Sequence, residues 1–447
     1  MNQLQRLGGE LLERAIARGA DGADAVVASG TSISIDVTRG TLEHAERAEG
    51  IDLGLRVLLG QRQAIVSASD SSDETLDEMA ERAVAMAREA PEDPYAGLAP
   101  ADMLARDFDV GALELADPGP EPSPDDLQVN AHAAESAALD IPGVTQVQSA
   151  TAAYGAQDVF LCTSNGFGAG YQRTSRSISV VAIAGEGTGM ERDYDGDSRI
   201  FQNDLRAPDD IGQKAGERAV ARLNPRKPAT GTYPVLFDER IASSLIGHLL
   251  MAVNGASVAR GSSWLKDAIG EKVLPDALSL VEDPHRPRIA ASRLFDGEGL
   301  PTARRVIVDK GVLTGWTLDL ASARKLGMRS TANASRGTSS LPSPSNWNIE
   351  LTQGDQTPGD LIRDMGRGVL VTSMIGSTIN PNTGDYSRGA SGFWIENGEI
   401  AYAINECTIA GNLRDMLRRF IPANDARTHL SRVVPSLMIE GMTIAGD

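Results

Sequence analysis

Apolar residues at helical spacing open the chain, and short strand-like runs follow them. Leu4, Leu7 and Leu11 share one face of a helix that ends near Gly19. The runs that follow are separated by short polar turns and read DAVVAS, SISIDVTRG, TLEHAERA, IDLGLRVLLG and QRQAIVSASD. Because connections this short join antiparallel neighbours, we expect a sheet that the opening helix covers.

The rest of the first half predicts three more helices and further strands. The helices are expected over residues 73–88, with Ser71 and Glu74 at capping-box spacing, and over 126–139 and 209–223. The acidic, proline-rich segment 107–126 is expected to form a surface connector. Strands are predicted near residues 144–154, 158–164 and 168–185.

A polar, proline-bearing segment, PRKPATGTYP, divides the chain. With 447 residues, the chain exceeds the size at which one core keeps growing. We therefore expect an α+β protein of two domains. Residues 1–225 would form a mixed or antiparallel sheet with covering helices, and residues 226–447 a β-rich, barrel-like domain with helices.

The second half begins with a buried strand, TYPVLFD, that leads into a helix over 240–253. Hairpin turns are predicted at residues 309–311 and at Asn397 and Gly398. The segment 334–346 is poor in apolar residues and is expected to be a mobile loop.

Charge and composition restrict the classes of binding partner that we expect. The net charge of −19 and pI near 4.8 disfavour nucleic acid and anionic membrane surfaces. Since no long apolar run predicts export or membrane insertion, we expect a cytoplasmic location. The two cysteines, Cys162 and Cys407, are far apart and suit a reducing compartment without a disulfide framework.

A zinc peptidase needs histidines on one helix face together with a carboxylate base. Of the five histidines, only His248 falls in a predicted buried helix, SSLIGHLLMAVNG. It is followed by Leu249 instead of Glu, and no second histidine lies within a turn. We therefore interpret His248 as a core or interface residue and expect no metal ligand in this chain.

Other nucleophile and phosphate-loop patterns are incomplete. GASGF places Ser391 almost as a nucleophile elbow requires, but Phe393 occupies the last glycine position of that motif. Both cysteines lie in apolar strand-like runs and are interpreted as packing residues. The strings GFGAG and GEGTG lack phosphate-loop spacing and are interpreted as strand bends.

The segment INPNTGDYSRGAS, residues 379–391, is rich in residues that tolerate positive φ and expose main-chain donors. An extended peptide would pair with such an edge. The alternative interpretation is an ordinary loop that connects two strands.

The longer stretch NPNTGDYSRGASGFWIENGEIAYAINECTIAGNL is similar to the signature of the TldD/PmbA family, also called the modulator of DNA gyrase family. It most resembles the PmbA, or TldE, branch, and the similarity extends over nearly the whole chain. The resemblance implies a subunit that pairs with a TldD-like protein in a cytosolic metallopeptidase. That complex would degrade or trim unstructured peptides.

In the TldD branch, an HExxxH helix and a later cysteine bind the metal. The corresponding helix here reads LIGHLLMAVNGAS, and the later region NDARTHLSRVVPS has no cysteine. The resemblance therefore implies no catalytic or metal-binding residue and no cofactor in this chain, with zinc held by the TldD-like partner. The residues carried over as candidates for contacting peptide are Asn380, Asn382, Thr383, Gly384 and Asp385.

Two other functions stay open from the sequence. The chain would be a hydrolase by itself, alone or as a homodimer, if it uses an unrecognised carboxylate, Ser or His site. Alternatively, it would be a non-enzymatic peptide-binding or regulatory protein, such as a modulator of a toxin–antitoxin system or of DNA gyrase.

Overall fold

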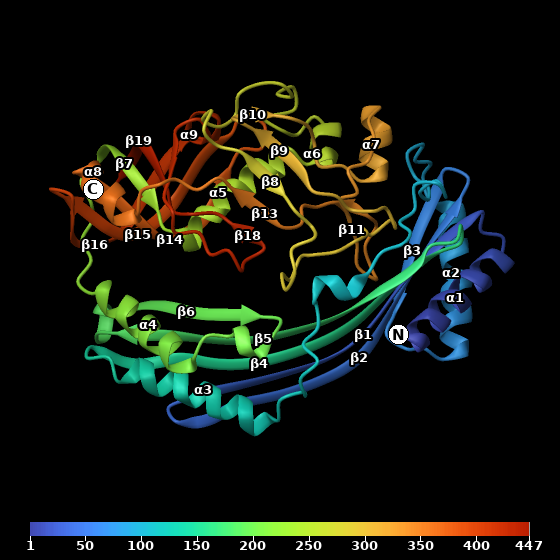
Figure 1. Ribbon diagram of the computed structural model, residues 1–447, viewed down its shortest axis with the longest axis horizontal. Coiled ribbons are helices and arrows are strands. Elements are labelled where there is room, and N and C mark those ends of the chain that lie inside the picture. Colours follow the sequence, from blue (N-terminus) through green and yellow to red (C-terminus); the bar gives the residue numbers. More distant parts are fainter. Residues whose placement is uncertain (447) are drawn as a thin grey trace.

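A six-stranded antiparallel sheet dominates the first half of the computed structural model, which describes residues 1–446 apart from the side chains of residues 377 and 378 (Figure 1). The strand order is β3 (Arg62–Ala68), β2 (Thr41–Leu59), β1 (Gly22–Thr38), β4 (Val144–Thr163), β5 (Gly168–Ala184) and β6 (Glu191–Arg199). This sheet is long and curved, and the second half of the chain lies on its concave side (Figure 1).

Two helix pairs cover the convex face of this sheet. Val27 packs beneath the first pair and Ile33 beneath the second; their even separation along β1 places both side chains on one face. The first pair is α1 (Asn2–Ala17) with α2 (Asp73–Glu89), and the second is α3 (Pro124–Leu139) with α4 (Pro208–Ala221). The apolar spacing seen in the sequence thus places each helix pair on one end of the sheet.

Several strands are longer than the sequence predicted. β2 runs without a break through Gly50, and β4 runs through the predicted gap at residues 155–157. Gly30 pairs with Gly50, and a Cβ at Gly30 would lie 2.8 Å from the Ala156 carbonyl oxygen. Gly30 thus allows close approach of β4, and the prediction that such polar positions separate strands was wrong.

Helix starts also differ slightly from the prediction. Ser72, not Ser71, caps α2 and accepts a hydrogen bond from the Thr75 amide. In α3 the cap is Ser123, and Pro124 occupies the first turn, so the proline-rich connector ends earlier than predicted. Proline suits that position because it has no amide hydrogen, and an amide hydrogen in the first helical turn would have no partner within the helix.

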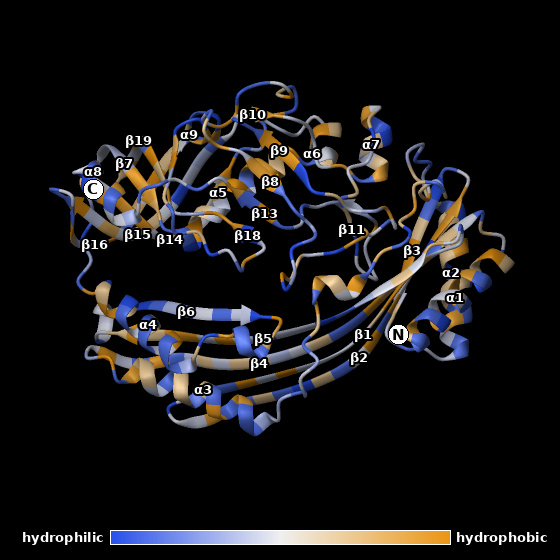
Figure 2. Ribbon diagram, in the orientation of Figure 1, coloured by the Kyte–Doolittle hydropathy of each residue, from blue (hydrophilic) through white to orange (hydrophobic). Residues whose placement is uncertain are grey.

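A closed barrel of five strands forms the centre of the second half, because β16 pairs with both β15 and β19. The barrel strands are β7 (Gly231–Phe237), β14 (Gly368–Ile379), β15 (Asp385–Glu396), β16 (Glu399–Asn412) and β19 (Leu437–Ala445), with β17 (Phe420–Pro422) paired to β19. Hydrophobic residues concentrate along β7, β19 and α5 (Glu239–Ala252) (Figure 2). The largest buried apolar cluster joins this helix to the barrel.

Smaller elements flank the barrel, and the α+β class expected from the sequence is confirmed. A second sheet contains β10 (Val312–Leu313), β9 (Arg305–Asp309), β8 (Leu280–Glu282), β13 (Ile349–Leu351) and β18 (Arg432–Val433). The short helices are α6 (Gly255–Ala259), α7 (Leu320–Leu326), α8 (Pro358–Met365) and α9 (Leu413–Leu417), with 3₁₀ turns at Val110–Leu113, Gly187–Gly189 and Gln202–Asp204.

The predicted hairpin turns are present, but segment 334–346 differs from the prediction. Lys310 and Asn397 adopt positive φ values of 47° and 54°, each followed by a glycine that does the same. Segment 334–346 contains the paired strands β11 (Ala334–Ser335) and β12 (Ser343–Pro344). Its Arg336 side chain is buried against Asp24 of the large sheet, and this contact holds a segment that looked like a free loop.

The chain passes from the large sheet to the barrel between Ala221 and Gly231, where the predicted domain boundary falls. The division into domains 1–225 and 226–447 stays a prediction. Of the helices within residues 1–446, none combines the length and apolar character that crossing a bilayer requires.

Candidate functional site

Helix α5 places His248 beside the end of the barrel. The helix follows β7 directly, and the Asp238 side chain caps it by accepting the Arg240 amide. His248 is 8% exposed, and neither ring nitrogen has a hydrogen-bond partner among the described residues. Burial, helped by the charge of Arg388, lowers the pKa of His248 to about 4. The imidazole is therefore neutral near pH 7 and offers one donor and one acceptor.

The loop between β14 and β15, residues 380–385, is held by its own hydrogen bonds; we call it the signature loop. The Asn380 carboxamide oxygen accepts the Asn382 amide at 2.9 Å, and the Gly384 amide donates to the Asn380 carbonyl at 2.8 Å. Thr383 donates to Asp385 at 2.6 Å. Thr383 and Asn412 lower the pKa of the Asp385 carboxyl. This bonding fixes the loop as one unit.

The five residues predicted to contact peptide all lie in this loop, but they do not share one environment. Gly384 is buried with φ of 81°, and a Cβ there would lie 3.5 Å from the Trp264 ring. Asn380, Asn382, Thr383 and Asp385 are exposed. Gly384 thus seats the loop, while the other four residues face outward. Their contact with peptide stays a prediction.

A groove of about 510 Å³ lies between α5, α6 and the signature loop, and we call it the α5 groove. Met251, Trp264, Ile379 and Pro381 give it apolar walls, and His248 lines it from α5. The remaining lining residues are Ala252, Asn254, Ala256, Ser257, Arg260, Ser262, Ser343 and Pro344. The groove combines apolar walls with uncharged polar groups and one cation. Sequence reasoning missed Trp264 and Arg260 because no motif marks them.

These residues do not fit a zinc centre. A metal would need at least three suitable side chains, and no such cluster of His, Cys, Asp or Glu occurs within the part of the chain described. Cys407 lies on β16, and its thiol donates to the Ala390 carbonyl at 3.2 Å. Burial raises the pKa of Cys407 to about 11, so the thiol is protonated and is a poor ligand at pH 7.

The near-elbow serine does not meet an imidazole either. The Ser391 hydroxyl accepts a hydrogen bond from Arg222 at 2.7 Å. Arg222 also pairs with Asp193 of β6 at 3.4 Å, so this contact joins the barrel to the large sheet. Arginine cannot take a proton from serine, and the arrangement is that of a structural bond.

A second cavity, of about 890 Å³, lies between the large sheet and the barrel; we call it the sheet–barrel cavity. Val181, Ile183 and Tyr194 line it from the sheet, and Ser373 and Ile375 line it from β14. β14 is irregular on either side of these two residues, where its pairing with β15 shifts register. Such shifts leave main-chain groups without a ladder partner. Gly389 and Ser391 of the GASGF run also line this cavity, but no motif marked its sheet wall, since the two walls come from distant segments.

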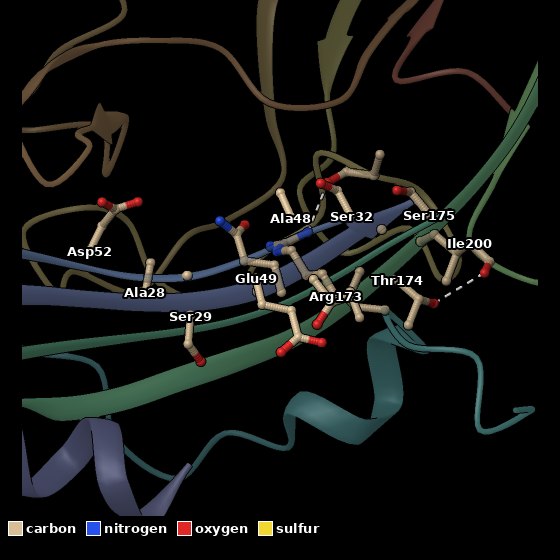
Figure 3. Close-up of a pocket in the computed structure, with 18 residues that line it drawn as sticks. Ala28, Ser29, Ser32, Ala48, Glu49, Asp52, Arg173, Thr174, Ser175 and Ile200 are labelled. Atoms are coloured by element: carbon tan, nitrogen blue, oxygen red, sulfur yellow. Dashed lines mark hydrogen bonds between the residues drawn. The ribbon is translucent and has the colours of Figure 1, made fainter. Parts of the chain in front are cut away.

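A third hollow, of about 530 Å³, lies along the large sheet where small residues replace core side chains. Ser29 and Glu49 point to one side of the strands, and Ser32 and Asp52 to the other (Figure 3). Arg173 is engaged, because its guanidinium donates to the carbonyls of residues 290 and 292 at 2.8 and 2.7 Å. This hollow therefore gathers few free groups for chemistry.

Sequence comparison identifies the family in which this combination of a curved sheet and a barrel occurs. Successive parts match the models of PmbA/TldA metallopeptidase domain 1 (residues 23–87), the central domain (117–223) and the C-terminal domain (230–446). The chain belongs to the PmbA/TldD family, as its sequence signature indicated.

Its relatives include the metalloprotease PmbA of Escherichia coli O157:H7, which is 39% identical over 432 residues, 96% of this chain and 93% of the relative. A PmbA homolog of Haemophilus influenzae is 36% identical over 434 residues, with 95% and 92% covered.

Solved structures share the fold. One, assigned as a modulator of DNA gyrase from Bacteroides thetaiotaomicron, matches with a TM-score of 0.92 at 27% identity, over 100% of both chains. TldE from Thermococcus kodakarensis matches with a TM-score of 0.85 at 21% identity, over 100% of both chains, and shows the fold alone.

Proposed function

We propose that this chain is a PmbA/TldE-type subunit without a metal of its own, which pairs with a TldD-like subunit in a peptidase that degrades or trims unstructured peptides. Zinc and the catalytic groups belong to the partner, and the complex works in the cytoplasm. Nucleic acid is not its ligand, because the net charge of −19 repels phosphate backbones. In the absence of its partner the chain is free to form a homodimer.

The observation that carries this proposal is the environment of His248. It occupies the helix in which TldD-branch proteins carry HExxxH, but Leu249 replaces the glutamate and Tyr386 is its aromatic neighbour at 5.9 Å. A hydrophobic, arginine-bordered setting favours a neutral imidazole, and no second metal-ligating side chain clusters with it among the described residues. The family scaffold is kept while the ligand set is incomplete, as suits a subunit that contributes surface instead of a metal.

The contribution of this subunit to substrate binding is main-chain pairing. β14 pairs with β7 only over residues 369–371, so among the described residues its other edge has no strand partner near Ser373, and Ile375 is 77% exposed at the sheet–barrel cavity. An extended peptide hydrogen-bonds to such strand edges with little dependence on its side chains. Folded proteins are too wide for a cavity of about 890 Å³ between two parts of the molecule. The proposal therefore explains selection of unstructured peptides.

The decisive experiment combines metal analysis with reconstitution. The purified chain is analysed for zinc, then mixed with a TldD-like protein from the same genome and tested on an unstructured peptide with and without chelator. We expect no stoichiometric zinc in the chain alone, a stable complex with the partner, and cleavage that needs both proteins and stops with chelator. Chelator-resistant cleavage by the chain alone, or zinc bound through His248, overturns the proposal.

The signature loop is tested in the reconstituted complex. Asn382→Ala removes an outward amide, and Thr383→Trp adds bulk at the exposed face. Both are expected to lower kcat/KM for peptide cleavage at least several-fold while the complex still assembles. Asn397→Gly is the matched control, because it changes a different hairpin where φ is already 54°. Unchanged cleavage by both loop variants argues against contact between this loop and the peptide.

A further inference from the structure

The α5 groove holds an enclosed histidine with unused hydrogen-bonding capacity. His248 is 8% exposed, and both ring nitrogens lack a partner among the residues described. Leaving a buried polar atom unsatisfied costs free energy, and such atoms in native proteins call for an explanation. His248 lines the groove, so a ligand seated there lies next to its imidazole ring.

Three arginines around this groove have no ion pair among the described residues. Arg260 lines the groove and reaches Ser257 at 3.5 Å, and Arg388 donates to the Gly376 carbonyl at 2.7 Å. The Arg414 guanidinium lies 5.9 Å from the Trp264 ring centroid. In a chain of net charge −19, uncompensated cations at one place mark a site for a negative group. None of the lining residues described for the groove is acidic.

The apolar part of the groove fits a large side chain. Met251 is 57% exposed, although it is a long apolar residue, and Trp264 is buried at the wall beneath the signature loop. A pocket of about 510 Å³ lies in the size range of sites for small organic groups. An aromatic or long aliphatic side chain is of the size needed to cover Met251 and reach Trp264 and Ile379.

We propose that the α5 groove binds one residue of an extended peptide: a large apolar side chain against Met251 and Trp264, with an adjacent carboxylate directed to Arg260 and hydrogen-bonded by His248. The carboxylate is either the peptide C-terminus or a neighbouring acidic side chain. This inference deepens the proposed function by naming the substrate feature that this subunit selects. It rests on the proposed role in peptide binding.

Binding to the chain alone tests the inference without the partner. Four fluorescein-labelled octapeptides of Gly and Ser are compared by anisotropy: one ending in Phe as a free acid, its amide, its Phe→Ala version, and an amide with internal Phe-Asp. We expect about tenfold weaker binding without Phe and about threefold to fivefold weaker binding of the simple amide. Recovery by the Phe-Asp amide identifies an acidic side chain as sufficient. If the Phe-Asp amide does not recover binding, the carboxylate that the groove binds is the peptide C-terminus.

Variants of the protein separate the role of Arg260 from that of His248. Arg260→Gln is expected to erase the preference for the free acid over the amide, and about 0.5 M salt should do the same. His248→Leu is expected to weaken free-acid binding about fivefold, with partial recovery in His248→Gln, which keeps a donor and an acceptor. Arg6→Gln on α1 is the matched control for loss of one exposed arginine and should bind as the unaltered chain does.

The outcomes distinguish this inference from the proposed function. Equal binding of all four peptides, or unchanged binding by both Arg260→Gln and His248→Leu, overturns the groove assignment even if the TldD-like partner binds and peptides are cleaved. The expected pattern in the chain alone supports the groove even if no partner complex forms. Thermal unfolding of each variant confirms that the fold is retained.

Discussion

Arg336 donates a hydrogen bond to Asp24 across 312 positions of the chain, and both side chains are almost fully buried. Arg56 pairs with the same carboxylate, with its Nε 2.9 Å from Asp24 Oδ2. Burial alone would raise the pKa of Asp24, but Arg336 and Arg56 together lower it. The ion cluster therefore joins the second half of the chain to β1 and β2 of the large sheet.

Asp24→Asn should destabilise the protein strongly. It leaves two buried guanidinium groups without a negative partner, which costs about 3–5 kcal/mol. The free energy of unfolding, measured in urea, checks this value. Because the pKa of Asp24 is lowered from 3.8, its contribution is present above that pH and is lost as pH falls through the folded value. The difference between the unaltered chain and the variant should therefore shrink in stronger acid.

The control for Asp24 is an exposed pair. Asp276→Asn removes the partner of Lys272, at 2.7 Å, where the Asp276 side chain is 79% exposed. It should leave the unfolding transition nearly unchanged. Arg336→Met combined with Asp24→Asn should be less destabilised than the sum of the single changes, since one unpaired charge is removed. Additive effects would contradict the assigned pairing.

The stability of the protein should fall between pH 6.5 and pH 4 because of His248. Its pKa is lowered from 6.5 to about 4, so the unfolded chain takes up a proton in this range before the folded chain does. His248→Gln cannot titrate. The melting temperature of the unaltered chain should therefore drop more steeply than that of His248→Gln as pH falls through this window. Parallel curves would show that His248 is not held neutral.

Neighbouring glycines in α1 should respond in opposite directions to alanine. A Cβ at Gly8 would lie 2.6 Å from the Cys162 sulfur, whereas a Cβ at Gly9 meets nothing within 4 Å. Gly9→Ala should raise the free energy of unfolding by up to about 1 kcal/mol through better helix propensity. Gly8→Ala should lower it, because the buried sulfur must move. Similar effects at both positions would argue against the packing of α1 on β4.

Both thiols should be protected in the folded protein. Cys162 and Cys407 are buried and free, and burial raises the pKa of Cys162 to about 12 and that of Cys407 to about 11. A thiol reagent at about pH 8 should therefore label neither residue until denaturant is added. Mass spectrometry counts the labels. Rapid labelling of Cys407 in the native state would contradict the burial of its thiol.

The sequence predicted local elements better than their extent. Leu7 and Leu11 have helical spacing and lie buried in α1, and Asn397 and Gly398 form the expected turn. By contrast, Gly50 looks like a strand end but lies inside β2, because its ladder with β1 continues on both sides of the Gly30–Gly50 pair. Local patterns report the conformational preference of each residue, whereas the length of a strand depends on the neighbouring strand with which it pairs.

The candidate site also combines features that the sequence predicted with features that it did not predict. The signature loop was visible as a run of Asn, Gly and Asp, since turn residues and their hydrogen bonds are local. Trp264 and Arg260 of the α5 groove were not predicted, because they line it together with Ile379 and Pro381, more than a hundred positions later. The same holds for Arg222 and Ser391, whose bond crosses from α4 to the barrel.

The sequence by itself determined the family, the α+β class and the turns, because these depend on residue identity and short-range spacing. Tertiary structure alone decided that Arg336 meets Asp24, that β16 closes the barrel against β19, and that His248 lines a groove with no hydrogen-bond partner from the described residues. Those features arise where segments distant in the chain come into contact, and local preference carries no record of such partners.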